Sequence, residues 1–231
     1  MSASKLEILA HEETPLGLLC LRRRPLPGRP ETVVTEITLD HEFLMSSWLT
    51  DSERALATSA LAMHAGTGLR VLVGGLGLGY TAHAALASDR VARVEVVEFL
   101  PQVIGWLRRG LVPLAAELNG DARLEVVEGD VYARLASAPG GTFDLILIDV
   151  DHSPVENLGG TNAAFYTEEG LHLARRHLAP GGILGVWSYA EHSPFSQALR
   201  RVFARVREDA VTVVNDLVDE EQTDWLFFAR D

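Results

Sequence analysis

The sequence predicts an α/β protein with a Rossmann-like, mostly parallel seven-stranded sheet, helices on both faces and a small N-terminal antiparallel β-hairpin region. From residue 69 onward, short apolar runs alternate with helix-forming stretches, which is typical of buried parallel strands joined by helices. Before residue 50, strand-like runs are separated only by turn residues, which is typical of hairpins. We therefore expect a small β-hairpin region over 1–50 and a larger α/β domain over 51–231.

The first fifty residues contain three strand-like runs, LEILA, GLLCLRR and TVVTEITL. Residues 14–17 (TPLG) form the expected turn between the first two runs, and the three prolines of segment 25–30 predict a loop before the third. The arginines at 22–24 are interpreted as a solvated hairpin end in preference to a ligand patch. A helix is expected from Asp51, because DSERALATSALAMHA starts with a capping residue and is rich in helix formers.

The alternating region supplies five expected strands, each followed by a helix, and two closing strands. The strands are LRVLVGG, ARVEVVEF, ARLEVVEGD, FDLILIDV and GGILGVWSY, with AVTVVND and DWLFFAR as the closing pair. The helices are YTAHAALA, PQVIGWLRRGLVPLAAEL with a proline break, VYARLAS, NAAFYTEEGLHLARRHL and PFSQALRRVFARV. The closing strands are joined too briefly for a helical crossover, so we expect them to pair antiparallel near an edge.

Composition excludes several classes of partner. The net charge of −12 argues against a binder of phosphate backbones, so no nucleic acid is expected. Cys20 is the single cysteine, which rules out internal disulfides and a Cys-based metal cluster and fits a reducing compartment. No apolar run reaches the roughly 18 residues of a membrane span, and MSASKLEILAHEE turns acidic too early for a secretory signal. We expect a cytoplasmic protein with no membrane partner.

Glycines and a carboxylate follow the first two parallel strands, at the edge where such sheets bind ligands. Gly75, Gly77 and Gly79 permit positive φ and close approach of a ligand, and the next helix offers free N–H groups. Glu98 ends the second strand about 20 residues later, where a carboxylate can accept both ribose hydroxyls of an adenosine. Together they favour a nucleoside cofactor over the alternatives, which are close strand–helix packing and a solvated strand end.

Acids also close the third and fourth parallel strands. Asp130 is a candidate acceptor for an exocyclic amine such as that of adenine, a candidate N-cap for the next helix, or both. Asp149, Asp151 and His152 follow the apolar run FDLILI. Repulsion between neighbouring carboxylates would raise one pKa and suit that group to proton transfer; the alternative is a polar strand end turned into a loop by Pro154. No His/Asp/Glu group has clear metal-ligand spacing, so no metal is expected.

These motifs resemble the spermidine synthase-like proteins, which belong to the class I AdoMet-dependent methyltransferase folds. The resemblance covers roughly residues 35–230 and is carried by GGLGLGYTAHAAL, VEVVEFLPQVI, EGDVYARL, FDLILIDVD, FYTEEGLHLARRHLAPGGILGVWS and the two closing strands. It implies that residues 51–231 form a nucleoside-binding transferase domain whose cofactor is S-adenosylmethionine (AdoMet) or decarboxylated AdoMet. By resemblance, the three glycines pass beneath the amino-acid part and sugar, and Glu98 holds the ribose. Asp130 contacts the adenine amine, Val131 lies beside the ring, and Asp149 lies near the reacting centre.

The chain departs from the aminopropyltransferases of this group at three places. Their GGGDG turn corresponds to residues 74–78, GGLGL, which lack the acid that helps to hold the cofactor's amine. Their DxxDP motif reads DVDHSP here, so Asp151 or His152 would have to replace the missing base. The tyrosine and histidine of their upstream Tyr-His-Glu triplet are absent from segment 53–58.

The expected function is methyl transfer from AdoMet to a small-molecule amine or hydroxyl acceptor. The alternatives are aminopropyl transfer from decarboxylated AdoMet to a polyamine, and a non-catalytic nucleoside-binding relative. Tyr80 is placed over the methionine end of the cofactor, and the apolar stretch 43–49 is a candidate homodimer surface. The candidates for the acceptor's proton are Asp149, Asp151 and His152, and those for acceptor binding are Asn162, Tyr166 and Trp187, with packing an equal alternative for Trp187.

Overall fold

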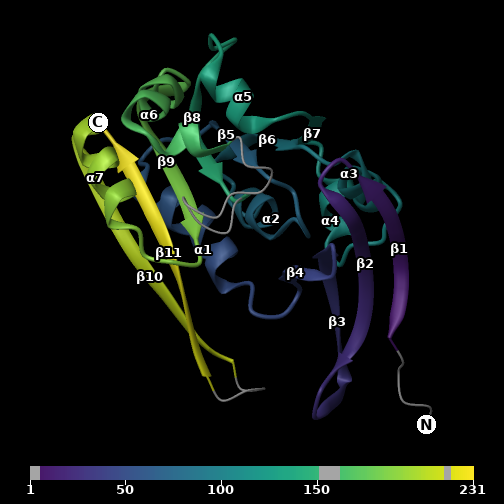
Figure 1. Cartoon of the computed structure of the whole chain (residues 1–231). Coiled ribbons are helices and arrows are strands. Elements are labelled where there is room, and N and C mark those ends of the chain that lie inside the picture. The colour runs from purple at the N-terminus through teal and green to yellow at the C-terminus, as the bar shows by residue number, and fades with distance from the viewer. Residues whose placement is uncertain (1–5, 151–161, 216–219) are drawn as a thin grey trace.

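A computed structural model describes residues 6–150, 162–215 and 220–231 and contains two sheets (Figure 1). The first is antiparallel, in the order β1-β2-β3-β4. Its strands are β1 (Glu7–Thr14), β2 (Gly17–Leu26), β3 (Arg29–Leu39) and β4 (Glu42–Ser46). The antiparallel N-terminal region is therefore confirmed.

Two predictions for the N-terminal region are wrong: the proline loop over residues 25–30 and the solvated hairpin end at the arginines 22–24. Pro25 lies inside β2 opposite Val33, and only residues 27–28 connect β2 to β3. The pairing register shifts just after Pro25, an irregularity at which a strand tolerates a proline. Arg22 and Arg24 both pair with the carboxylate of Glu36, whose side chain is 2% exposed.

The second sheet has seven strands in the order β10-β11-β9-β8-β5-β6-β7. Its strands are β5 (Leu69–Gly74), β6 (Val91–Glu98), β7 (Leu124–Glu128), β8 (Phe143–Ile148), β9 (Leu178–Ser188), β10 (Arg205–Asn215) and β11 (Glu220–Arg230). Strands β5 to β9 run parallel to one another, whereas β11 is antiparallel to both β9 and β10, as predicted. The chain proceeds from β5 outward to β7 and returns at β8 on the other side of β5. The strand order therefore reverses between β5 and β8, which is where ligands bind in such sheets.

Helices cover both faces of this sheet, as expected. The apolar side chains of each strand alternate between two cores: Val71 and Val73 pack on one face, and Leu72 packs on the other. The first core also takes in Leu19 and Leu21 of β2, so the N-terminal sheet shares it. The helices of the first core are α1 (Asp51–Met63), α2 (Tyr80–Leu86), α3 (Pro101–Arg108) and α4 (Ala115–Gly120); those of the second are α5 (Val131–Ala136), η1 (Asn162–Tyr166), α6 (Glu168–Arg175) and α7 (Ser193–Val202).

Three helix boundaries differ from the prediction. The helix expected over 162–178 divides at Thr167, whose hydroxyl accepts a hydrogen bond from Gly170 N and caps α6. The helix expected over 194–206 ends at Val202, because the chain then enters β10 and pairs with β11. The N-cap of α1 is Thr50 rather than Asp51, and its side chain makes no capping hydrogen bond. None of the described helices is long and apolar enough to cross a membrane.

Candidate functional site

A cavity of about 610 Å³ lies at the carboxyl ends of β5 to β8. Its opposite wall comes from β2, β3, β4 and the segment that leads into α1, including much of the apolar stretch 43–49. The β10–β11 hairpin closes one end, so the cavity lies between the two sheets that diverge in Figure 1. This volume lies within the range of about 300–1,000 Å³ that is typical of small-molecule sites.

The glycine turn after β5 forms part of the cavity floor. Gly75 and Gly77 line the cavity with φ of 90° and 49°. A Cβ atom on Gly75 would lie 2.2 Å from the Asp149 carbonyl oxygen, and one on Gly77 would lie 2.5 Å from Met45 Sδ. Gly79 differs, because its φ is 91° but its Cβ position faces Leu118 Cδ1 at 2.4 Å, away from the cavity lining. Gly79 is thus required mainly by its positive φ, and its Cβ position faces the packed side chain of Leu118.

Glu98 holds the glycine turn from the end of β6. Its Oε2 accepts a hydrogen bond from Leu76 N, and its Oε1 accepts one from Leu100 N, both at 2.8 Å. Burial raises the pKa of this carboxyl, and the backbone donors oppose the shift. The backbone N–H groups of Gly77 and Phe99 also favour the charged form of Glu98, and its contact with ribose hydroxyls stays a prediction.

Asp130 is the N-cap of α5, and its contact with an exocyclic amine stays a prediction. Its Oδ1 accepts hydrogen bonds from Tyr132 N at 2.8 Å and Ala133 N at 3.1 Å, which caps α5. Because one oxygen carries both capping bonds, Oδ2 is left for a ligand in the cavity that Asp130 and Val131 line.

Three carboxylates face the centre of the cavity from different elements. Asp149 follows β8, and its Oδ2 accepts a hydrogen bond from Thr81 Oγ1 at 2.5 Å. Glu53 lies in the first turn of α1, and Asp224 lies in β11. The Ser52 hydroxyl joins the last two, at 2.7 Å from Asp224 Oδ2 and 3.1 Å from Glu53 Oε2.

Burial and electrostatic repulsion raise the pKa values of Glu53 and Asp149. Burial raises the pKa of Glu53 to about 8, with added repulsion from Asp149 and Asp224. Burial raises the pKa of Asp149 to about 6, opposed by the Thr81 hydrogen bond and reinforced by Asp224. Among the described residues that line the cavity, Arg24 is the only cation, and it is paired with Glu36. A buried carboxylate ionises readily only beside a compensating cation, and the described lining residues offer Glu53, Asp149 and Asp224 no free cation.

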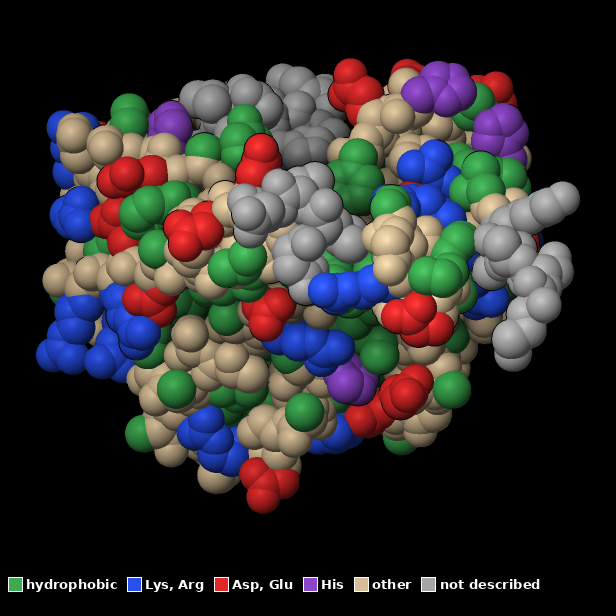
Figure 2. Space-filling model, turned by 90° about the horizontal axis from the view of Figure 1, so that it is seen from below, with side chains coloured by type: hydrophobic (Ala, Val, Ile, Leu, Met, Phe, Trp, Pro, Cys, Tyr) green, Lys and Arg blue, Asp and Glu red, His purple; other side chains and the backbone are tan. Residues whose placement is uncertain are grey.

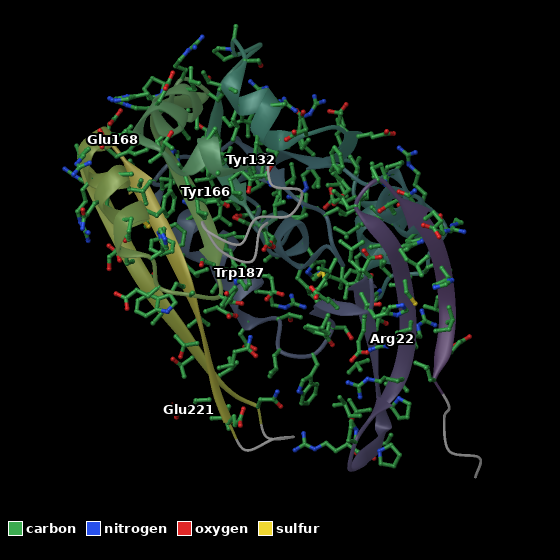
Figure 3. All side chains as sticks on the ribbon, viewed as in Figure 1. Arg22, Tyr132, Tyr166, Glu168, Trp187 and Glu221 are labelled. Carbon is green, nitrogen blue, oxygen red and sulfur yellow. The ribbon has the colours of Figure 1, made fainter. Side chains whose placement is uncertain are left out.

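The remaining predicted site residues lie in three kinds of place. Tyr80, Asn162 and Trp187 line the cavity. Tyr166 does not; its hydroxyl lies 3.0 Å from that of Tyr132 inside an aromatic cluster behind the wall (Figure 3). Asp151 and His152 fall outside the described residues. The described residues contain no group of three or more His, Cys, Asp or Glu side chains placed to hold a metal ion.

Glu53 and Asp224 were not predicted as site residues, although the apolar pattern around each of them indicates a buried acid. Glu53 stands three and seven positions before Leu56 and Ala60, so it lies on the buried stripe of α1. Asp224 lies two residues before Leu226, on the face of β11 that enters the core. An acid within an apolar stripe indicates a buried carboxylate, which proteins rarely place without a partner.

No protein-family model matches the chain, but curated proteins and solved structures do. The chain is 36% identical over 119 residues, 51% of its length, to a polyamine aminopropyltransferase 2 of Streptomyces coelicolor, of which this covers 21%. It is 31% identical over 147 residues to a polyamine aminopropyltransferase of Mycobacterium tuberculosis, covering 62% of this chain and 27% of that one. It is 28% identical over 115 residues to putrescine N-methyltransferase 4 of Nicotiana tabacum, covering 50% and 28%. The matches thus span only about a fifth to a quarter of the length of these relatives.

The solved structures match almost the whole chain. A spermidine synthase in complex with the transition state analogue AdoDATO superposes with a TM-score of 0.75 at 20% identity, covering 96% of this chain and 73% of that one. The spermidine synthase of Thermotoga maritima gives 0.72 at 19% identity, covering 96% and 72%. The fold is of the class I AdoMet-dependent methyltransferase type. The chain therefore has a spermidine synthase-like fold, and over 51% to 62% of its length it is similar to polyamine aminopropyltransferases.

Proposed function

We propose that this chain is a transferase that moves the aminopropyl group of decarboxylated AdoMet to an amine acceptor. This choice reverses the order expected from the sequence, where the missing acid of the glycine turn favoured methyl transfer. The polyamine aminopropyltransferase relatives, at 36% and 31% identity, support it over the putrescine N-methyltransferase at 28%.

The main support for the proposal is the acidic character of the cavity wall. Five carboxylates line the cavity without an ion-pair partner among the described residues: Glu53, Glu98, Asp130, Asp149 and Asp224. The carboxylate of AdoMet would add a negative charge to this wall. Decarboxylated AdoMet instead carries a sulfonium and an ammonium, and an amine acceptor adds a further positive charge, so both substrates complement the wall.

The residues act mainly by binding and orientation. Decarboxylated AdoMet supplies the activated carbon, since its sulfonium is a good leaving group. Glu98 would hold the ribose hydroxyls, and Asp130 Oδ2 would accept the adenine amine. Glu53 and Asp224 would hold the acceptor's ammonium group beside Asp149, where a nearby cation lowers the pKa values of Glu53 and Asp149.

Proton transfer completes the step. The acceptor nitrogen loses a proton to Asp149, attacks the propyl carbon next to sulfur, and the carbon–sulfur bond breaks to release methylthioadenosine. Alignment of nitrogen, carbon and sulfur and exclusion of water supply most of the rate. Thr81 orients Asp149 through its hydrogen bond at 2.5 Å.

Calorimetry and product analysis test this proposal. Decarboxylated AdoMet is expected to bind at least tenfold more tightly than AdoMet, and to yield methylthioadenosine when an amine is present. Asp149→Asn should lower product formation at least a hundredfold while nucleoside binding persists, and Asp89→Asn on an exposed turn should change neither. Tighter binding of AdoMet with methylated product would establish the second candidate, methyl transfer, which the missing acid at Gly77 and the Nicotiana relatives favour. Failure of both nucleosides to bind would refute the transferase.

A further inference from the structure

We propose that Ser52 is a positioning residue, which joins Glu53 and Asp224 into one proton-sharing pair that releases a proton when it binds the acceptor's ammonium group. This inference rests on the proposed amine acceptor. Ser52 is 3% exposed and is not among the described residues that line the cavity, so it acts through its two acidic neighbours. The inference predicts how the pH dependence of amine binding changes when this hydroxyl is removed.

The Ser52 hydroxyl lies between two carboxyl groups. Its Oγ is 2.7 Å from Asp224 Oδ2 and 3.1 Å from Glu53 Oε2. A hydroxyl has one hydrogen, so it donates fully to only one of these oxygens at a time. The other contact is a hydrogen bond only if that carboxyl group carries a proton and donates it to Ser52 Oγ. The geometry therefore accommodates one proton between the two acids.

This proton lies on Glu53 in the ligand-free protein. Asp224 accepts on both of its oxygens, because Oδ2 has the shorter contact with Ser52 and Oδ1 accepts a hydrogen bond from Gln222 Nε2 at 3.4 Å. Burial raises the pKa of Glu53 to about 8, with added repulsion from Asp149. At neutral pH, Glu53 is therefore the donor to Ser52 Oγ, and Ser52 donates to Asp224.

Other charged and titratable groups surround Glu53. Asp149 at the end of β8 repels its charged form, and Tyr80 on α2 interacts electrostatically with Glu53 and with Arg54. The Arg54 guanidinium lies 4.8 Å from the centroid of the Tyr80 ring, and its Nε donates to Thr50 Oγ1 at 3.1 Å. Every variant described below keeps these groups, so they do not explain a difference between variants.

An ammonium group at this pair changes the proton balance. It brings a positive charge and N–H donors, which favour the ionised form of Glu53. Glu53 then loses its proton to solvent, while Ser52 keeps its own hydrogen and donates to one of the two carboxyl groups. One positive charge enters for each proton that leaves, so the net charge of the buried site does not change. This exchange avoids an uncompensated charge in the interior.

Calorimetry measures the proton exchange directly. Binding of 1,4-diaminobutane is followed in the presence of methylthioadenosine, from about pH 6.5 to about pH 8.5, in buffers with different heats of ionisation. About one proton should be released per amine at pH 7, because Glu53 is still protonated there whereas Asp149, with a pKa of about 6, is largely ionised. The affinity should rise by up to about tenfold per pH unit and level off near pH 8.

Two substitutions should move this profile in opposite directions. Ser52→Ala removes a hydrogen-bond donor that lowers the pKa of Glu53, so the pH at which the affinity levels off should rise by at least about half a unit. Asp224→Asn removes a charge that raises the pKa of Glu53, so the same pH should fall. Ser52→Thr keeps the hydroxyl and should restore the wild-type profile.

Controls separate a positioning role from simple packing. Thr58→Ala removes a hydroxyl from the exposed side of the same helix and should not move the profile. Thermal unfolding verifies that each variant is folded. If Ser52→Ala does not fold, Ser52→Cys carries the test, because a thiol of similar size is a weaker donor and should also raise the levelling pH.

The outcomes distinguish this inference from the proposed function. Amine binding without proton release would overturn the inference and leave the amine transferase intact. The same holds if loss of the Ser52 hydroxyl weakens binding but leaves the pH profile in place, since Ser52 would then act only by packing. Absence of amine binding by the wild-type chain at every pH would overturn the proposed function, and this inference with it.

Discussion

Glu53, Asp149 and Asp224 are far apart in the chain, yet their carboxyl groups share one buried wall. With a pKa of about 8, Glu53 keeps its proton at neutral pH in the ligand-free protein. An ammonium group placed among the three acids would favour the ionised forms of Glu53 and Asp149, so binding of an amine should release protons.

These shifts make stability depend on pH. The pKa of Glu53 rises from 4.5 to about 8 on folding, so between these values the folded chain binds more protons than the unfolded chain. The free energy of unfolding should therefore fall as pH rises from 4.5 toward 8, by at most about 1.4 kcal/mol per pH unit. Asp149 adds a fall of the same sign between 3.8 and 6. Urea unfolding across this range measures the effect.

Asp224→Asn provides the matched variant for that experiment. Asp224 raises the pKa values of both other acids, so its neutralisation should flatten the pH profile. Asp89→Asn should leave the profile as it is, because this residue is exposed and outside the cavity. A wild-type profile without the fall would contradict the assignment of buried, mutually repelling acids.

The sequence located some of these residues and not others, for a physical reason. Glu98 and Asp130 end strands of a parallel sheet, so their shared edge follows from the order of the strands. Glu53 and Asp224 meet only because α1 packs against β11, and the Ser52–Asp224 hydrogen bond spans 172 residues. No local pattern encodes that contact. Tyr166 shows the converse, since its spacing after β8 suited a site residue but its ring packs behind Tyr132.

At the scale of single elements, the turn between β5 and α2 is set by backbone geometry. Gly75→Ala should lower the free energy of unfolding by about 1–3 kcal/mol, because alanine disfavours positive φ and its methyl group would meet the Asp149 carbonyl oxygen. Methylthioadenosine binding should weaken as well, since the turn is part of the cavity. Denaturant unfolding and calorimetry measure the two effects.

Gly105 offers the control for this substitution. It lies within α3, and a Cβ atom there has nothing within 4 Å. Gly105→Ala should therefore stabilise the protein by up to about 1 kcal/mol, through helix propensity alone, and leave nucleoside binding unchanged. Equal effects of the two substitutions would show that the turn at Gly75 is not constrained.

The sequence predicted which segments are helices and strands more accurately than it predicted their first and last residues. Alternation of apolar runs and helical stretches correctly gave all seven strands of the large sheet. The start of β10 at Arg205 was not predicted, because residues 203–206 have a composition typical of a helix. Their position in the fold, however, favours a strand. Pairing with β11 makes this segment a strand, and that pairing is a tertiary contact that the local sequence does not encode.

At the scale of the whole molecule, the two sheets share one hydrophobic core. Leu19 and Leu21 of the N-terminal sheet pack in the core that includes Trp106 of α3. Polar contacts reinforce the join, with Arg23 Nη2 donating to Leu111 O at 3.2 Å and Gln102 Nε2 donating to Glu13 O at 3.1 Å. We therefore propose that residue 50 separates two regions of different architecture that fold together as one unit.

A single cooperative unfolding transition is expected from this shared core. Tryptophan fluorescence and far-ultraviolet circular dichroism should give coincident curves. Leu21→Ala should lower the free energy of that one transition by about 2–5 kcal/mol, because Leu21 is fully buried. Two separated transitions, with only the first shifted by this substitution, would show that the sheets unfold independently.

The excess of acidic side chains behind the net charge of −12 is unevenly distributed over the molecule. Acidic and basic side chains are interspersed on the face shown in Figure 2. The cavity, by contrast, has one paired cation among its described lining residues. Part of the acidic excess is therefore concentrated where substrates would bind, which favours entry of cationic molecules.

Glu98 links two segments that a nucleoside would touch, the turn after β5 and the start of α3, through the two oxygens of one side chain. Removal of this one carboxylate would therefore free both segments at once. A substitution here is expected to change the shape of the crevice together with its hydrogen-bond acceptors.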